Sequence, residues 1–75
     1  MTNPLDPSVE DLTPRELAVL RLMAQGLPNR KIAEQLAVNE RTIKHYVSEI
    51  LSKLEVENRT QAITYGAVHG LITLK

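Results

Sequence analysis

The 75-residue chain contains no cysteine, no tryptophan and no phenylalanine, and it has only two tyrosines. Without cysteine there is no disulfide bridge, no thiolate metal site and no cysteine nucleophile. The few aromatic side chains do not support a stacking platform for single-stranded nucleic acid. The core must therefore consist of leucine, isoleucine, valine and alanine. A chain this short predicts a single small domain with a modest core, of marginal stability or supported by a partner copy.

The chain also lacks net charge, because nine basic residues balance nine acidic ones. A neutral total argues against a nucleic-acid binder, but the charges are unevenly distributed. Residues 1–16 are acidic, whereas basic residues outnumber acidic ones over residues 28–53: Arg30, Lys31, Arg41, Lys44 and Lys53 against Glu34, Glu40 and Glu49. Since counterion release depends on the local patch, this segment predicts modest, strongly salt-dependent DNA affinity for a monomer.

Long apolar runs are absent too, and the first residues show no basic stretch followed by an apolar one. We therefore expect a cytoplasmic protein without a secretory signal or a membrane partner. Residues 1–11 contain Pro4, Pro7 and several acidic side chains, which predicts a flexible linker or N-terminal arm. Residues 12–75 would form the domain.

Start and stop signals predict four helices and no strand, an all-α fold. Thr13-Pro14-Arg15-Glu16 forms a capping box with proline at the first helical position, and Gly26 follows as a stop. The predicted helices span about Pro14–Gln25, about 29–36 with Asn29 as cap, about Glu40–Leu54 capped by Asn39, and about Thr60–His69 capped by Asn58 and ended by Gly70.

Residues 29–48 fit two short helices joined by a tight turn, with apolar side chains at the inward positions and the small Ala33 where the helices would cross. Ala37 occupies the turn position at which glycine is usual, so the turn should adopt another geometry or carry strain. The outward face of the second helix carries Arg41, Lys44, His45 and Ser48. All four can donate hydrogen bonds to phosphates and purine edges.

Several features have two readings. Asn29, Arg30 and Lys31 could surround a phosphate at a helix N-terminus, or form a capped, solvated turn. Leu17 and Ala18 widen either a buried face or a contact surface for another domain. The small residues Gly66 and Ala67 fit packing on the first helix or a symmetric pair. A protein-interaction module that binds no DNA is the alternative function.

An enzyme is not indicated. His45 and His69 lie on different predicted helices without an acidic partner, and Ser48 is merely a helical neighbour of His45. Two histidines are also a poor set of ligands for a metal site. We therefore expect no catalytic residues, no metal and no cofactor.

Four runs resemble a known family: Leu12-Thr13-Pro14-Arg15-Glu16, residues 26–33 (GLPNRKIA), Thr42-Ile43-Lys44 and residues 53–62 (KLEVENRTQA). Together they are similar to the LuxR-type helix-turn-helix, the output domain of NarL/FixJ-like response regulators. The likeness covers about residues 12–72. The last two runs also argue against a promoter-reading polymerase subunit, which uses similar helices.

The resemblance implies a transcription regulator that binds double-stranded DNA, with the helix at about 40–54 in the major groove and the helix at about 60–69 pairing two subunits. By position, Lys44, His45 and Ser48 would meet base edges with Arg41 beside them. Phosphates would be held by Asn29, Arg30, Lys31, Thr42 and the Tyr46 hydroxyl. The dimer would form through Ala62, Ile63, Gly66 and Ala67.

Family members usually carry a receiver or ligand-binding domain before this one, so we expect either an isolated effector domain or a stand-alone regulator. Three departures stand out. Tyr46 occupies a position that often holds histidine in the family. Ser48 occupies a position that is basic in some relatives, and Leu17 and Ala18 occupy positions that are usually charged. Specificity should therefore depend on Lys44 and His45.

Overall fold

The computed structural model describes residues 12–72, so the linker predicted over residues 1–11 lies outside the described residues, as do residues 73–75. Four helices follow one another: α1 (Pro14–Ala24), α2 (Asn29–Leu36), α3 (Glu40–Leu54) and α4 (Arg59–Val68). No strand occurs between residues 12 and 72. The predicted all-α, four-helix fold is confirmed.

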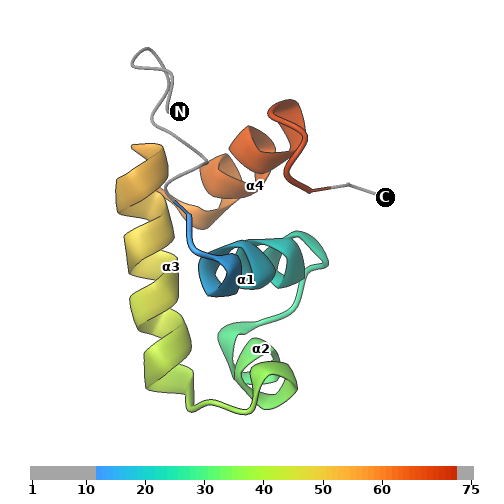
Figure 1. Ribbon diagram of the computed structural model, residues 1–75, viewed down its shortest axis with the longest axis vertical. Coiled ribbons are helices and arrows are strands. Elements are labelled where there is room, and N and C mark those ends of the chain that lie inside the picture. The colour runs from blue at the N-terminus through green and yellow to red at the C-terminus, as the bar shows by residue number, and fades with distance from the viewer. Residues whose placement is uncertain (1–11, 73–75) are drawn as a thin grey trace.

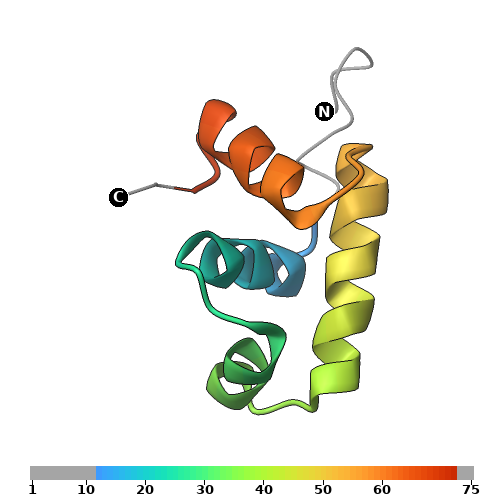
Figure 2. The same cartoon turned by 180° about the vertical axis from the view of Figure 1, so that it is seen from behind.

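The longest helix, α3, runs beside a stack of the other three (Figure 1). In both views α1 lies between α4 and α2 (Figure 2), and α3 packs against all three. One side of α3 is therefore held along its whole length, while its opposite side has no neighbouring helix among the described residues.

Local capping explains where the helices begin. Thr13 accepts a hydrogen bond from the Glu16 amide at 3.1 Å, and the Glu16 carboxylate accepts one from the Thr13 amide at 2.9 Å, which confirms the capping box. Asn39 caps α3 through the Thr42 amide at 2.8 Å. At the start of α4, Asn58 accepts from the Gln61 amide at 2.9 Å. These caps satisfy amides that have no partner inside their helices.

The start of α2 differs from the prediction. Asn29 was expected to cap this helix, but Pro28 is the N-cap and Asn29 is the first helical residue. Pro28 makes no side-chain cap, and the Asn29 side chain is engaged elsewhere, by Arg59. The predicted bounds of α3 and the end of α2 are confirmed, whereas α1 ends one residue early, at Ala24, and α4 is shifted by one residue, to Arg59–Val68.

The turn of the helix-turn-helix keeps its usual geometry without glycine. Ala37 adopts the left-handed conformation at φ 58° and ψ 41°, and the Val38 amide donates to the Ala33 carbonyl at 3.0 Å. Of the two predicted outcomes, strain is the one observed, because a Cβ in this region costs about 1–2 kcal/mol. Glu55 ends α3 in the same conformation at φ 57°.

The core lies where α3 meets the stack. Its buried apolar residues are Val19, Leu20, Met23, Ile32, Ala33, Ile43, Ile50, Leu54, Ala62 and Ile72. A Cβ on Gly66 would lie 3.2 Å from Leu20 Cδ2 and 3.1 Å from Ile72 Cδ1, so glycine permits the close approach of α4 here. Gly66 therefore serves packing of α4 against α1, which is the first of the two predicted readings.

A partly buried ion pair connects the beginning of α1 to the end of α3. The Glu16 carboxylate, 4% exposed, accepts a hydrogen bond from Lys53 Nζ at 2.8 Å. Burial of the carboxyl raises its pKa, but the hydrogen bonds and charge from Lys53 and the bonds from Thr13 outweigh that effect. The pKa of Glu16 is lowered below its usual value.

Candidate nucleic-acid interface

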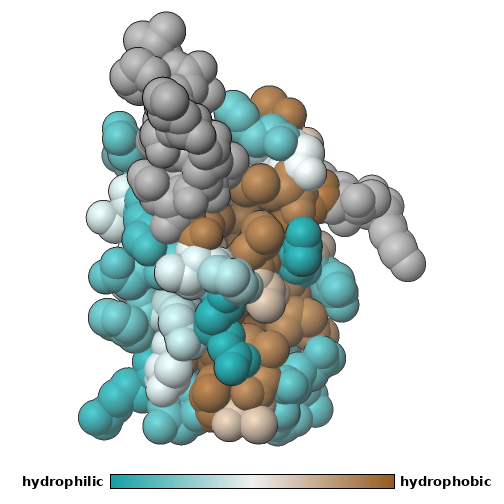
Figure 3. Space-filling view, in the orientation of Figure 1, coloured by the Kyte–Doolittle hydropathy of each residue, from teal (hydrophilic) through white to brown (hydrophobic). Residues whose placement is uncertain are grey.

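The side of α3 away from the stack carries the residues predicted to read DNA. Ile43, Ile50 and Leu54 are buried beneath the helix. Four exposed side chains at i, i+3, i+4 and i+7 form one stripe, here called the reading face: Arg41, Lys44, His45 and Ser48. Figure 3 shows the surface over α3 as mostly hydrophilic, while apolar surface gathers over the α4, α1 and α2 stack.

Lys44 is only weakly held within the protein. Its ammonium group lies 4.0 Å from the Glu40 carboxylate one turn earlier, and the two side chains are 67% and 48% exposed. Exposed pairs of this kind contribute roughly 0.3–0.5 kcal/mol, so the pair does not prevent Lys44 from binding another group. Lys44 and His45 point to solvent, as the prediction requires.

The beginning of α2 places three further predicted residues near one another. Arg30 and Lys31 are exposed, and Lys31 lies 3.7 Å from the exposed Glu34. Asn29 is half-buried, and its carboxamide oxygen accepts a hydrogen bond from Arg59 Nη1 at 2.6 Å. A helix N-terminus beside two exposed cations forms a combination that suits an anion.

Thr42 and Tyr46 are less available than the sequence indicates. The Thr42 hydroxyl is 2.9 Å from Asn39 Oδ1, to which it donates within the α3 cap. Its hydrogen must turn away from the cap before it can donate to a phosphate. Tyr46 is partly buried and packs against the core, so its ring is not fully available to DNA.

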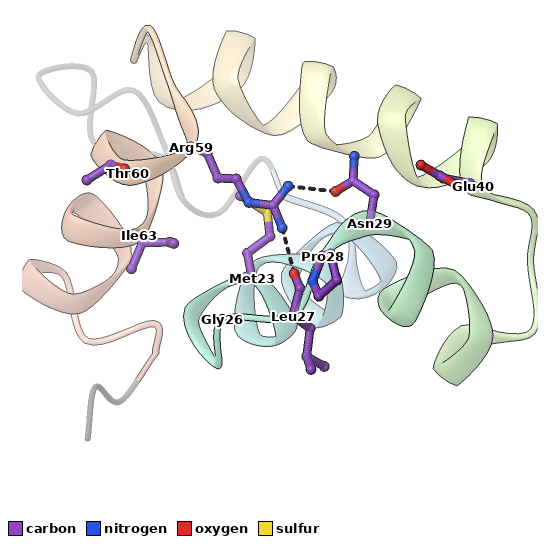
Figure 4. Close-up of a pocket in the computed structure, with 9 residues that line it drawn as sticks. All are labelled: Met23, Gly26, Leu27, Pro28, Asn29, Glu40, Arg59, Thr60 and Ile63. Atoms are coloured by element: carbon purple, nitrogen blue, oxygen red, sulfur yellow. Dashed lines mark hydrogen bonds between the residues drawn. The ribbon is translucent and has the colours of Figure 1, made fainter.

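A shallow groove runs between the beginnings of α2 and α4. It is lined by Met23, Gly26, Leu27, Pro28, Asn29, Glu40, Arg59, Thr60 and Ile63 (Figure 4). Arg59 crosses the groove, since its second terminal nitrogen donates to the Leu27 carbonyl at 2.8 Å. Sequence reasoning missed Arg59, because its partners lie 30 and 32 residues away and no local pattern indicates them.

The four residues predicted to pair two subunits do not share one environment. Ala62 and Gly66 are buried inside the protein and offer no surface to a second copy. Ile63 and Ala67 are partly buried, and Val68 is 76% exposed. Any contact between copies through α4 must therefore involve its outer side, where Val68 is the exposed large apolar residue.

Neither a membrane span nor a metal site is found in the described part of the chain. Within residues 12–72 no helix is both long and apolar enough to cross a bilayer. In the same range no three histidine, cysteine, aspartate or glutamate side chains converge as a metal site would require.

The second helix of a helix-turn-helix here presents a face rich in hydrogen-bond donors, and three helices pack against its opposite side. This arrangement defines a DNA-binding domain. The family model of bacterial regulatory proteins, luxR family, matches residues 10–66, and the chain belongs to this family. A solved structure described as that of the transcription factor GerE superposes with a TM-score of 0.81 at 31% sequence identity, covering 85% of this chain and 96% of the other.

The curated relatives are longer proteins. The chain is 49% identical over 63 residues to the response regulator protein VraR of Staphylococcus aureus (strain Mu3) and, with the same figures, to VraR of Staphylococcus epidermidis (strain RP62A). The alignment covers 84% of this chain but only 30% of each relative. The family predicted from the four sequence runs is confirmed, and the roles of single residues on DNA stay predictions.

Proposed function

We propose that the chain is the output domain of a transcriptional regulator of the two-component response-regulator class. Its relatives are called response regulators, and it spans about 30% of their length. That difference leaves room for an N-terminal receiver or ligand-binding domain in a longer protein. The partner would be double-stranded DNA in the cytoplasm, and the task would be binding, without catalysis or a cofactor.

The reading face is the observation that supports sequence-specific recognition. An α-helix about 10–12 Å wide fits a major groove about 12 Å wide, and the stripe at i, i+3, i+4 and i+7 would then face the base pairs. Lys44 donates to guanine O6 or N7, and His45 and Arg41 reach neighbouring bases or phosphates. Ser48 has a short side chain and contributes less.

Phosphates flanking the groove would be bound from two sides. Arg30 and Lys31 project from the beginning of α2 and supply charge, while Asn29 supplies an amide donor. Thr42 and Tyr46 would contact the backbone beside α3, Thr42 after its hydroxyl hydrogen leaves Asn39. Such contacts fix the position of the helix in the groove without reading sequence.

Two copies would bind one operator. We assign the contact between copies to the outer side of α4, with Val68, Ile63 and Ala67 facing the partner, while the buried Ala62 and Gly66 set the position of α4 on α1. Two domains related by a twofold axis require half-sites about one helical turn apart. Selection of bound duplexes from a random pool should return two such half-sites, whereas a single unrepeated motif would contradict pairing.

Replacement of Lys44 tests the recognition role. Loss of a guanine contact worth about 1–3 kcal/mol predicts a Lys44→Ala variant with roughly 5- to 150-fold weaker affinity for the selected duplex. The fold should persist, because Lys44 is exposed. Arg15→Ala removes the same charge from the exposed start of α1 and serves as the matched control. Equal affinity of the two folded variants in titrations of the same duplex would reject the assignment.

A further inference from the structure

Arg59 joins two parts of the chain that lie far apart in sequence. It is the first residue of α4, yet both terminal nitrogens of its guanidinium group bond across the groove. Nη1 donates to Asn29 Oδ1 at 2.6 Å, and Nη2 donates to the Leu27 carbonyl at 2.8 Å (Figure 4). Arg59 is itself partly buried. One side chain of α4 thus holds both the end of the α1–α2 loop and the first residue of α2.

The contact decides which way the Asn29 carboxamide points. Arginine can only donate hydrogen bonds, so the oxygen of the amide must face Arg59 and the nitrogen must face away. In Figure 4 the Asn29 nitrogen points away from the guanidinium group, towards the side on which α3 lies. Among residues 12–72 no fully buried side-chain nitrogen or oxygen lacks a hydrogen bond, so the Asn29 amide nitrogen, which has no partner among them, is not fully buried.

We infer that Arg59 is a positioning residue for DNA binding: it holds the Asn29 carboxamide with its amino group turned away from the guanidinium group and towards the α3 side, as a donor for a DNA phosphate. This inference rests on the proposed function and adds a residue that none of the predicted contacts includes. A free asparagine side chain can present oxygen or nitrogen, and oxygen repels a phosphate. Fixing the orientation in advance removes the unproductive state.

The proposal also connects the two tasks assigned to the domain. Arg59 belongs to α4, the helix proposed to contact a second copy, whereas Asn29 belongs to the helix-turn-helix. A rigid link between them means that the phosphate donor keeps a fixed place relative to the pairing helix. The two copies would then present their donors at a fixed separation along the duplex.

A double-mutant cycle on the whole chain tests the link. If Arg59 acts through Asn29, Arg59→Ala and Asn29→Ala each weaken binding to the selected duplex by roughly tenfold, and the double variant is no weaker than either one. The dependence of affinity on salt should keep the same slope in Arg59→Ala. A direct phosphate contact by Arg59 would instead give additive losses and reduce that slope by about 0.9, which overturns the positioning role.

Asn29→Asp separates positioning from mere stabilisation. The carboxylate would pair with Arg59 and preserve or raise the melting temperature, but it has no donor and brings a negative charge to the phosphate. Affinity should therefore fall by tenfold or more in a fully folded protein. Unchanged affinity of Asn29→Asp would refute the inference, and this variant remains decisive if Arg59→Ala does not fold.

Lys44→Ala distinguishes failure of this inference from failure of the proposed function. If Lys44→Ala binds the duplex more weakly than the wild-type chain, as predicted above, while the Asn29 and Arg59 variants bind normally, the inference alone fails. If neither the wild type nor any variant binds duplex DNA at low salt, the proposed function fails with it.

Discussion

Replacement of Glu16 by glutamine should destabilise the domain measurably, although the side chain changes by one atom type. Glutamine keeps an oxygen that can accept the hydrogen bond from the Thr13 amide, now 2.9 Å long. It loses the negative charge that holds Lys53 Nζ at 2.8 Å. The variant therefore isolates the ion pair between α1 and α3 from the capping box.

The size of the effect follows from the exposure of the two partners. Breaking a fully buried pair costs about 3–5 kcal/mol. The Lys53 side chain is 28% exposed and the Glu16 side chain 6%, so water can partly solvate the ammonium group left behind. A charged hydrogen bond contributes about 1.5–3 kcal/mol, and we expect a loss in that range. Domains of this size lose about 4–8 °C in melting temperature per kcal/mol.

Thermal unfolding followed by far-ultraviolet circular dichroism measures the loss. Glu34→Gln is the matched control, because it removes the same charge from an exposed pair with Lys31 and should change stability by no more than about 0.5 kcal/mol. If Glu16→Gln melted within the error of Glu34→Gln, the inference that the Glu16–Lys53 pair stabilises the fold would be refuted.

The pH dependence provides a second check on the same pair. The pKa of Glu16 is lowered in the folded protein, so its contribution to stability is complete above the usual value of 4.5. The contribution is lost as the pH falls through the lowered folded value. The gap in unfolding free energy between wild type and Glu16→Gln should therefore be full at neutral pH and narrow in acid. A gap that stayed constant would contradict the assigned pKa direction.

Two further substitutions test local geometry. Ala37→Gly should raise the unfolding free energy by up to about 1 kcal/mol in chemical denaturation, because glycine relieves the positive φ of 58°. As a control, Gln35→Gly within α2 should lower the unfolding free energy by about 1 kcal/mol. If both variants were less stable than the wild type, strain at Ala37 would be disproved. Asn39→Ala should cost about 1 kcal/mol and increase hydrogen exchange at the first amides of α3, while unchanged exchange at Thr42 would show that the cap is dispensable.

Local signals in the sequence were sufficient to place the helices. The capping box at Thr13 and Glu16 and the caps at Asn39 and Asn58 depend on neighbours within a few positions. Each is readable without knowledge of the fold. The reading face follows for the same reason, since helical periodicity alone places Arg41, Lys44, His45 and Ser48 opposite the buried Ile43 and Ile50.

The errors arose where distant residues meet. Asn29 has the chemistry of a cap, but Arg59 draws its side chain away, and the start of α2 is left to Pro28. Val68 is apolar, yet it is 76% exposed, because Ala62 and Gly66 occupy the side of α4 that faces α1 and Ile72. Ile72 itself lies beyond the predicted helix and still belongs to the core.

The separation between the two sides of α3 has a consequence for how such a regulator could acquire new targets. The buried side supports the fold, whereas the four residues of the reading face are exposed, and the ion pair that Lys44 forms with Glu40 is weak. Substitutions at exposed positions usually change stability by no more than about 0.5 kcal/mol. Operator preference could therefore drift, or be redesigned by randomising these four codons, with little penalty in folding.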